Sequence, residues 1–532
     1  MGTVLTDSLK MSESVRTVPV TLATHENFSF RRRDMGITVT GKVNAGFAST
    51  DITPPSGTHL AGSGAGVHRP SRNVLDKLHA KAAVFKSSDM TLVIVEMDVT
   101  IITDDYADKI AKGIMDALKI PREHIMIMGT QTHSAPAVGY FNIDKDYPLN
   151  IPENREYIRG GEKAYSDMAA QKAVEAAVQA EKNVKPLYMQ TRRAMIRGLA
   201  FNRRIICREN QEETIDTEVS YKVGIAWKKG DVIMPFPMDN TSENNPFGPD
   251  YMSHEEGPID NEVPVSSFAN EDGSIESMIL HFTCHPVNAY CNPDTYYDVS
   301  ADWPGVWADM VRNRMNVGQL PVTINGCCGN TNPIDPYEAD QVTDAAVMSG
   351  KLADMTEKLV SFMNYENAED AKLDARFEWL PLNYREMPQW RKDQYEKILG
   401  NDISTPAYAP DGSLDVDWFY AASSYCVELQ RKREPVFMYP VQVFRIGDMA
   451  IVGLAGEPFS EGQLRLKMES PALLTMVGHM ANKYVGYIPT KEGCAHGGLE
   501  AHPLHTYWNK MEPDALDKIV NKSIELLNDM YR

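Results

Sequence analysis

Short apolar runs alternate along this chain with stretches in which apolar residues recur every three or four positions. Thr91–Val99 is a dense run of β-branched residues and predicts a buried strand. In Asp104–Leu118, the residues Ile110, Ile114 and Leu118 fall on one stripe, which predicts an amphipathic helix. The alternation favours an α/β fold, with mixed sheets flanked by helices, over an all-α or all-β fold.

The same patterns continue through the rest of the chain. Further strands are expected at His124–Met128, from Lys185 to Ile196, at Ile275–Thr283, at Val322–Asn325 and over the hairpin Val441–Ala455. Further helices are expected at Glu162–Lys182, Asp340–Met363 and Asp514–Tyr531, and another starts at Asp302, with that residue as its N-cap. Asn367–Pro435 has no clear period and is expected to be an irregular insertion. We expect an N-terminal extension over residues 1–40 and one domain over 41–532.

Polar side chains that suit catalysis or ligand binding follow five of the expected strands. In open α/β sheets, ligands bind in the crevice outside the carboxyl ends of the strands, so we expect these side chains to converge. No local zinc motif such as His-Glu-x-x-His is present, so any metal site must combine distant residues. The side chains are those of Gln131, His133, His285, Asn330, Asn332, Glu457 and Tyr487.

Composition and charge narrow the class of protein. The chain has 532 residues, 43% of them apolar, which is enough for a large core. Its net charge of −20 opposes binding to nucleic acid or to an anionic membrane. The polar N-terminus has no apolar run of signal or membrane-span length, so we expect a cytoplasmic protein. The seven cysteines, including the adjacent Cys327 and Cys328, have no disulfide-framework spacing and are expected to be reduced.

A loop and seven further motifs resemble, in order, those of the catalytic domain of the neutral ceramidase family. The resemblance covers roughly Val43 to Leu499 and implies a ceramidase-like catalytic domain. The motifs are Gly129-Thr130-Gln131-Thr132-His133-Ser134-Ala135-Pro136, Asp51-Ile52-Thr53-Pro54, Val74-Leu75-Asp76-Lys77-Leu78-His79-Ala80 with Asp98 downstream, Asn202-Arg203, Phe282-Thr283-Cys284-His285-Pro286, Gly329-Asn330-Thr331-Asn332-Pro333, Ala455-Gly456-Glu457-Pro458 and Tyr484-Val485-Gly486-Tyr487-Ile488.

The resemblance also implies roles for individual residues. It makes His285, Glu457 and Tyr487 metal ligands, and it puts Gln131 in the position of a fourth ligand. It places His133 and Arg203 over the metal, where they would hold a substrate carbonyl or the oxyanion formed from it. Arg204 competes with Arg203 for this role.

The chain departs from the family pattern at several positions. The family has a zinc-binding histidine where this chain has Gln131, whose neutral amide oxygen is a poorer zinc ligand than imidazole. The expected ion is therefore zinc or a harder divalent cation such as Mn²⁺. Asn332, within Asn330-Thr331-Asn332, stands where ceramidases have a serine beside the metal, and an amide cannot act as a nucleophile. We expect Asn330, Asn332 and Gln131 to contact substrate. Leu499 stands where the family has a tyrosine, and we expect a catalytic domain without the C-terminal immunoglobulin-like domain of the family.

Three functions remain open at this stage. The first, which we favour, is a metal-dependent hydrolase that cleaves an amide or related bond in a soluble small molecule by metal-activated water. The second is a lyase or carbohydrate-processing enzyme that uses the same pocket. The third is a metal-free descendant that binds a ligand without turnover. A homo-oligomer is compatible with the sequence, but no interface can be identified.

Overall fold

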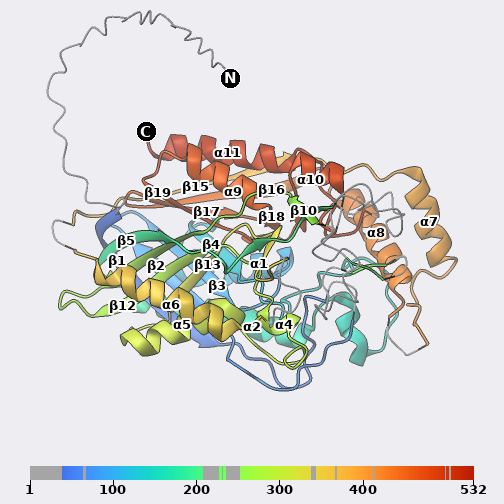
Figure 1. Cartoon of the computed structure of the whole chain (residues 1–532), viewed down its shortest axis with the longest axis horizontal. Coiled ribbons are helices and arrows are strands. Elements are labelled where there is room, and N and C mark those ends of the chain that lie inside the picture. The colour runs from blue at the N-terminus through green and yellow to red at the C-terminus, as the bar shows by residue number, and fades with distance from the viewer. Residues whose placement is uncertain are drawn as a thin grey trace, which may run out of the picture. The chain divides into compact units, whose positions relative to one another are not determined.

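Two β-sheets are stacked face to face at the centre of the fold (Figure 1). The structure is a computed structural model. It describes residues 39–63, 67–207, 227–229, 232–234, 252–336, 343–365, 368–410, 414–497, 499–501 and 505–532. Residues 37–532 form one compact unit. The two sheets bury an apolar core between them, to which Phe47, Phe85, Met126, Phe444 and Ile451 contribute.

The large sheet has eight strands in the order β13-β12-β11-β5-β1-β2-β3-β4. Its two outermost pairs, β12 with β13 and β3 with β4, are parallel, and its other pairs are antiparallel. The strands are β1 (Val39–Asp51), β2 (His79–Lys86), β3 (Thr91–Met97), β4 (Ile125–Gly129), β5 (Lys185–Met195), β11 (Glu262–Ala269), β12 (Ile275–Phe282) and β13 (Val322–Asn325).

The small sheet has four strands in the order β15-β16-β17-β19, and its last pair is parallel. These strands are β15 (Leu373–Leu382), β16 (Phe437–Ile446), β17 (Met449–Leu454) and β19 (Leu474–Gly478). Four short pairs lie outside both sheets: β6 (Phe201–Asn202) with β14 (Thr331–Asn332), β18 (Glu457–Pro458) with β20 (Tyr487–Ile488), β7 (Ile205–Cys207) with β10 (Met252–Glu255), and β8 (Trp227–Lys229) with β9 (Val232–Met234).

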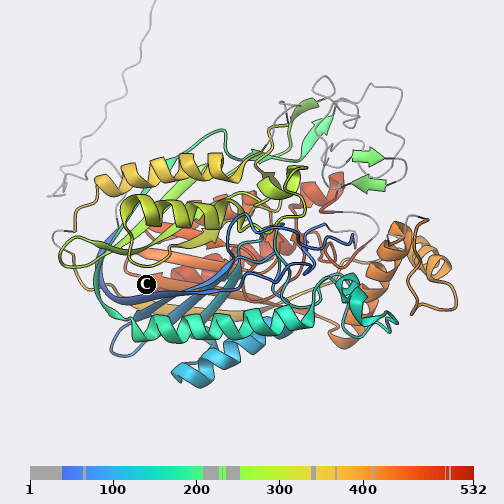
Figure 2. The ribbon, with the colours of Figure 1, turned by 90° about the horizontal axis from the view of Figure 1, so that it is seen from below.

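Helices cover the outer face of each sheet. Figure 2 shows α5 and α6 side by side over one part of the large sheet and α1 and α2 over the other. Helices α9 and α11 pack on the small sheet. The helices are α1 (Asp104–Leu118), η1 (Arg122–His124), η2 (Glu153–Arg159), α2 (Lys163–Lys182), α4 (Asn288–Cys291), α5 (Asp302–Met315), α6 (Ala345–Ser361), α7 (Gln389–Leu399), α8 (Val416–Arg433), α9 (Ser460–Glu469), α10 (Lys491–His496) and α11 (Ala515–Met530).

The mixed α/β class expected from the sequence is confirmed, and most expected elements occur within a few residues of their predicted bounds. The expectation of irregular structure over Asn367–Pro435 is wrong. That segment contains β15, α7 and α8, and β15 pairs with β16 along its whole length. Of the helix expected over Asp340–Met363, the first residues lie outside the described part of the chain.

Asp302 does not act as the N-cap of α5. The cap position belongs to Ala301, and Asp302 has a positive φ of 54°. Its carboxylate accepts hydrogen bonds from the Asn288 amide and from the backbone N–H of Ala289. Asp302 therefore links α4 to the start of α5. A local capping pattern does not predict this contact, because the two segments are separated in the sequence.

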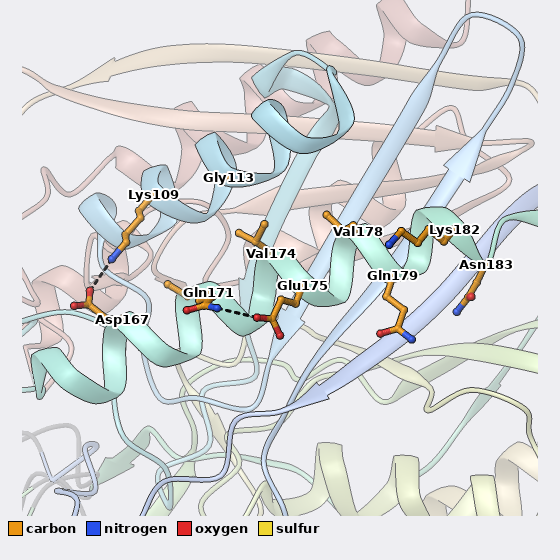
Figure 3. Close-up of a pocket in the computed structure, with 11 residues that line it drawn as sticks. Lys109, Gly113, Asp167, Gln171, Val174, Glu175, Val178, Gln179, Lys182 and Asn183 are labelled. Atoms are coloured by element: carbon orange, nitrogen blue, oxygen red, sulfur yellow. Dashed lines mark hydrogen bonds and ion pairs between the residues drawn. The ribbon is translucent and has the colours of Figure 1, made fainter.

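A surface groove of about 930 Å³ lies between α1 and α2 (Figure 3). Charged and polar groups along it pair with one another, as in Lys109 with Asp167 and Gln171 with Glu175. None of the candidate site residues lines it. Within the described part of the chain, no helix is both long enough and apolar enough to cross a bilayer.

Lys510 is fully buried near the start of β16. Its Nζ lies 3.6 Å from the ring centroid of Tyr507 and 5.8 Å from that of Phe437. This nitrogen has no hydrogen-bond partner among the described residues. Burial lowers the pKa of Lys510 from 10.5 to about 7, because the charged form is poorly solvated there.

Replacing Lys510 should stabilise the fold, and more so at lower pH. Below a pKa of about 7 the native ammonium is charged and the full burial cost applies. Between that value and an unfolded-state pKa of about 10.4, the unfolded chain holds more protons, so stability rises with pH. Urea unfolding should show a larger gain for Lys510→Met at pH about 6.5 than at pH about 9.5.

Lys483→Met provides the matched control. Lys483 pairs with Asp104 and Glu434, so its loss should destabilise the protein. A gain for Lys510→Met that is the same at both pH values would contradict the assigned burial cost.

Candidate functional site

The segments that follow β4, β12, β13 and β19 meet at one end of the sheets, and Asn325 joins them. Its side-chain amide donates to the carbonyl of Thr130, 3.0 Å away, and its side-chain oxygen accepts from the N–H of Cys284. Its backbone carbonyl accepts from the N–H of His479. Because β4 and β13 lie at opposite edges of the large sheet, these contacts bring the two edges together here.

His285 follows β12 and is completely buried. Its Nδ1 lies 2.5 Å from the carbonyl oxygen of Cys328 and 3.2 Å from that of Thr331. Carbonyl oxygens only accept, so Nδ1 carries the proton and Nε2 of the neutral ring presents a lone pair. Burial, together with the positive charge of Arg203, lowers the pKa of His285 well below its usual value and keeps the ring neutral.

Glu457, the first residue of β18, presents its carboxylate to this lone pair. Its Oε2 lies 3.4 Å from His285 Nε2, and its Oε1 accepts from the Tyr484 hydroxyl at 3.2 Å. Neither His285 Nε2 nor Glu457 Oε2 has a hydrogen-bond partner among the described residues. Two buried hydrogen-bond acceptors that face each other with no proton between them raise the free energy of the folded state.

These two atoms fit a metal ion. Zinc bonds to nitrogen and oxygen of about 2.0–2.2 Å place two tetrahedral donors about 3.4 Å apart. Among the described residues, no three His, Cys, Asp or Glu side chains are arranged to hold a metal. Further donors must therefore be of another type, and the phenol of Tyr487 is one that coordination would favour.

Tyr487 and Arg203 stack beside this pair. Tyr487 is the residue opposite Glu457 in the short β18–β20 pair. The guanidinium carbon of Arg203 lies 5.4 Å from the Tyr487 ring centroid. Burial raises the pKa of Tyr487 well above its usual value, with a further contribution from the Glu457 charge, and Arg203 opposes this effect.

Arg203, rather than Arg204, faces the site. Arg203 donates to the Gly329 carbonyl at 2.6 Å and pairs with Glu500 at 2.8 Å. Arg204 pairs with Glu500 from the other side and with Glu256. Glu500 thus bridges both guanidinium groups. Burial lowers the pKa of Arg203. The neighbouring Tyr487 and Glu500 raise it, and the net shift is upward, so the guanidinium stays charged.

His133 lies beside His285, with the two ring centroids 5.5 Å apart. Its Nδ1 donates to the carbonyl of Gly62 at 3.0 Å, so the neutral ring leaves Nε2 as an acceptor. Burial, and then the proximity of His285, lowers the pKa of His133 to about 3. Gly62 has a φ of 91°, and a Cβ there would come within 2.8 Å of the His133 ring. This position therefore requires glycine.

Gln131 is buried and contacts a histidine that the sequence analysis missed. His479 follows β19, and its Nε2 lies 2.8 Å from Gln131 Oε1. The Cys328 thiol lies near both, 3.5 Å from the Gln131 oxygen and 3.6 Å from His479 Nε2. The signal was available, because His479 directly follows an apolar strand, as the other candidate polar residues do.

Asn330 and Asn332 lie next to the site, but each has a structural contact. The Asn330 amide donates to Glu461 at 2.9 Å, and its oxygen accepts from the N–H of Ser460 at the start of α9. The Asn332 oxygen accepts from the N–H of Ile334, which closes a turn. Burial raises the pKa of the Cys328 thiol well above its usual value, which opposes a thiolate nucleophile.

Two solved structures share this fold. One, titled "Ceramidase complexed with C2", matches 92% of this chain and 75% of its own, with a TM-score of 0.63 and 14% identity. The neutral ceramidase from Pseudomonas aeruginosa matches 93% of this chain and 74% of its own, with a TM-score of 0.61 and 15% identity. The chain therefore has a ceramidase-like fold. No protein-family model and no curated protein matches the sequence.

Asn325→Ala should destabilise the protein by roughly 1–3 kcal/mol, since it leaves two buried backbone groups without partners. Asn332→Ala is the control, because the Asn332 oxygen closes only a local turn. Its cost should be roughly 1 kcal/mol or less. Urea unfolding of both variants measures the difference, and equal losses would show that Asn325 does not join the segments as described.

Proposed function

We propose that this protein is a metal-dependent hydrolase that cleaves an amide or related bond in a soluble small molecule. The observation that carries the proposal is the buried pair of facing acceptors, His285 Nε2 and Glu457 Oε2, which lie 3.4 Å apart and have no hydrogen-bond partners within the part of the chain that the structure describes. The ceramidase-like fold supports the same reaction class.

His285, Glu457 and Tyr487 would hold the ion. An imidazole nitrogen, a carboxylate and a phenolate suit zinc, and the oxygen donors also suit Mn²⁺. When bound, the cation would lower the pKa of a water ligand to about 7 and polarise the scissile carbonyl. The carbonyls of Cys328 and Thr331 hold the His285 ring in the tautomer that ligation needs.

His133 is suited to move the proton. With Nδ1 donating to Gly62, its Nε2 would accept a proton from the attacking water and later deliver it to the leaving amine, although a pKa of about 3 makes the ring a weak base. This changes the expectation that His133 stabilises the oxyanion by donation, because a neutral ring in this tautomer has no N–H to offer at Nε2.

Arg203 is suited to stabilise the oxyanion. The Gly329 carbonyl and Glu500 hold the Arg203 guanidinium in place against the Tyr487 ring. Little reorganisation would therefore be needed when negative charge develops on the carbonyl oxygen of the substrate. Attack by water remains the hydrolytic route, because the Asn332 amide is not a nucleophile and the Cys328 thiol is disfavoured as a thiolate.

Metal content is the test of the centre. The wild-type protein, purified without added metal or chelator, should carry about one equivalent of zinc or another divalent transition metal by elemental mass spectrometry. His285→Ala should carry much less. His281→Phe is the matched control, because it also removes a buried imidazole. Its metal content should equal that of the wild type, because the His281 Nε2 contacts the carbonyl of Val477. An empty wild-type protein that also takes up no added metal would refute the proposal.

His133→Gln separates proton transfer from oxyanion stabilisation. Glutamine can donate a hydrogen bond but cannot act as a base, so kcat on acyl-amide substrates should fall roughly 10²–10⁴-fold. Metal content should not change. A variant that keeps wild-type kcat would show that His133 does not transfer the proton.

A further inference from the structure

Strand β15 forms an open edge of the small sheet. It comes first in the order β15-β16-β17-β19. The N–H of Gly447 donates to the carbonyl of Lys372, so the backbone groups of even-numbered residues in β15 point to β16 and those of odd-numbered residues point away from it. The outward backbone groups of Phe377 and Trp379 have no hydrogen-bond partner within the described part of the chain. Such an edge is a template for another strand.

The open part of this edge is short. The N–H of Ala375 donates to the Asp374 carboxylate at 2.9 Å, and the Ala375 carbonyl accepts from the Arg376 guanidinium at 2.9 Å. These side-chain contacts can be exchanged for strand pairing. Pro381 has no N–H to donate, so the edge loses a donor toward the end of β15. The free groups are therefore centred on Phe377.

The two faces of β15 differ in chemistry. On one face, the rings of Phe377 and Trp379 lie 5.1 Å apart, and Trp379 is 51% exposed. On the other face, which α11 covers (Figure 1), Arg376 pairs with Asp529 and Glu378 pairs with Lys522. The strand thus presents an exposed aromatic group on one side and charges of opposite sign on the other.

An antiparallel pair of two β15 strands, centred on Phe377, is self-complementary. It places Arg376 of each copy opposite Glu378 of the other, and it places the large Trp379 opposite the small Ala375. Because the two copies are equivalent in a two-fold arrangement, each of these pairs occurs twice.

Shifted pairings are less favourable. A shift of the centre by one residue puts either Arg376 or Glu378 opposite the same residue of the other copy, and like charges directly opposite one another are destabilising. A further shift toward the start of β15 would need the N–H of Ala371, which donates to the carbonyl of Lys42. Charge and backbone contacts together select the pairing centred on Phe377.

We propose that this chain forms a two-fold symmetric homodimer through β15, which joins the small sheets of two copies into one continuous sheet. The proposal does not depend on the metal centre. Each copy has a net charge of −20, but salt at about 0.15 M screens charges that lie more than about 8 Å apart. The opposed side chains of a strand pair have Cβ atoms only about 5 Å apart, so their attraction persists.

Charge reversal on the full chain tests this interface. Sedimentation of the wild type should give twice the monomer mass of 59.5 kDa. Arg376→Glu and Glu378→Arg each put like charges opposite one another twice, so each should raise the dissociation constant of the dimer at least about 10-fold. A mixture of these two variants restores opposite charges at both positions and should form a heterodimer more tightly than either variant forms a homodimer. The double variant should also regain the dimer.

Lys112→Glu is the control, because it reverses an exposed charge on α1 that pairs with Asp116. It should leave the dimer unchanged. A wild type that is monomeric at about 100 µM would overturn the proposal, as would single variants that dimerise as tightly as this control. A double variant that stays as weak as the single variants would show that lost contacts with α11, rather than the interface, explain the effect, and would also overturn it.

Trp379→Lys keeps the proposal testable if the single charge variants do not fold. The Trp379 side chain lies on the face of β15 away from Arg376 and Glu378, so its replacement leaves their contacts with α11 intact. It should weaken the dimer by at least about 10-fold, and an unchanged dissociation constant would refute pairing through β15.

Discussion

The site depends on one asparagine that joins strands from both sheets. The large sheet has its parallel pairs at its two edges, so the loops after β4 and β13 begin far apart in strand order. The Asn325 side chain spans the gap to Thr130, and its carbonyl fixes the ring of His479 from the small sheet. This connection helps to bring together residues that strand order alone would place at separate edges.

The arrangement leaves too many lone pairs facing one another. Carbonyls fix the proton of His285 on Nδ1, and the acceptor atom of Glu457 faces the remaining nitrogen. Protonating the ring would relieve this, but burial lowers its pKa. In the proposed centre, a divalent cation would satisfy both atoms without adding a buried proton.

Local patterns were sufficient for most of the elements, because burial of one face enforces a period. Helix α1 has the bounds that its apolar stripe predicts, and Val322–Asn325 forms the expected strand. Strand β15 was missed because it is an edge strand with mixed exposure, including a half-exposed Trp379, so its alternation is weak. The role of Asp302 could not follow from local sequence, because its partners Asn288 and Ala289 lie more than ten residues away.

The contact between Gly62 and His133 has a consequence for reading other sequences. A side chain at position 62 would occupy the space of the imidazole, so glycine there and a working histidine at 133 come as a pair. In a chain that keeps this loop geometry, a residue larger than glycine at this position would displace the histidine. A histidine retained opposite a bulky residue would be a relic in an altered pocket, so the motif around it would no longer identify an enzyme.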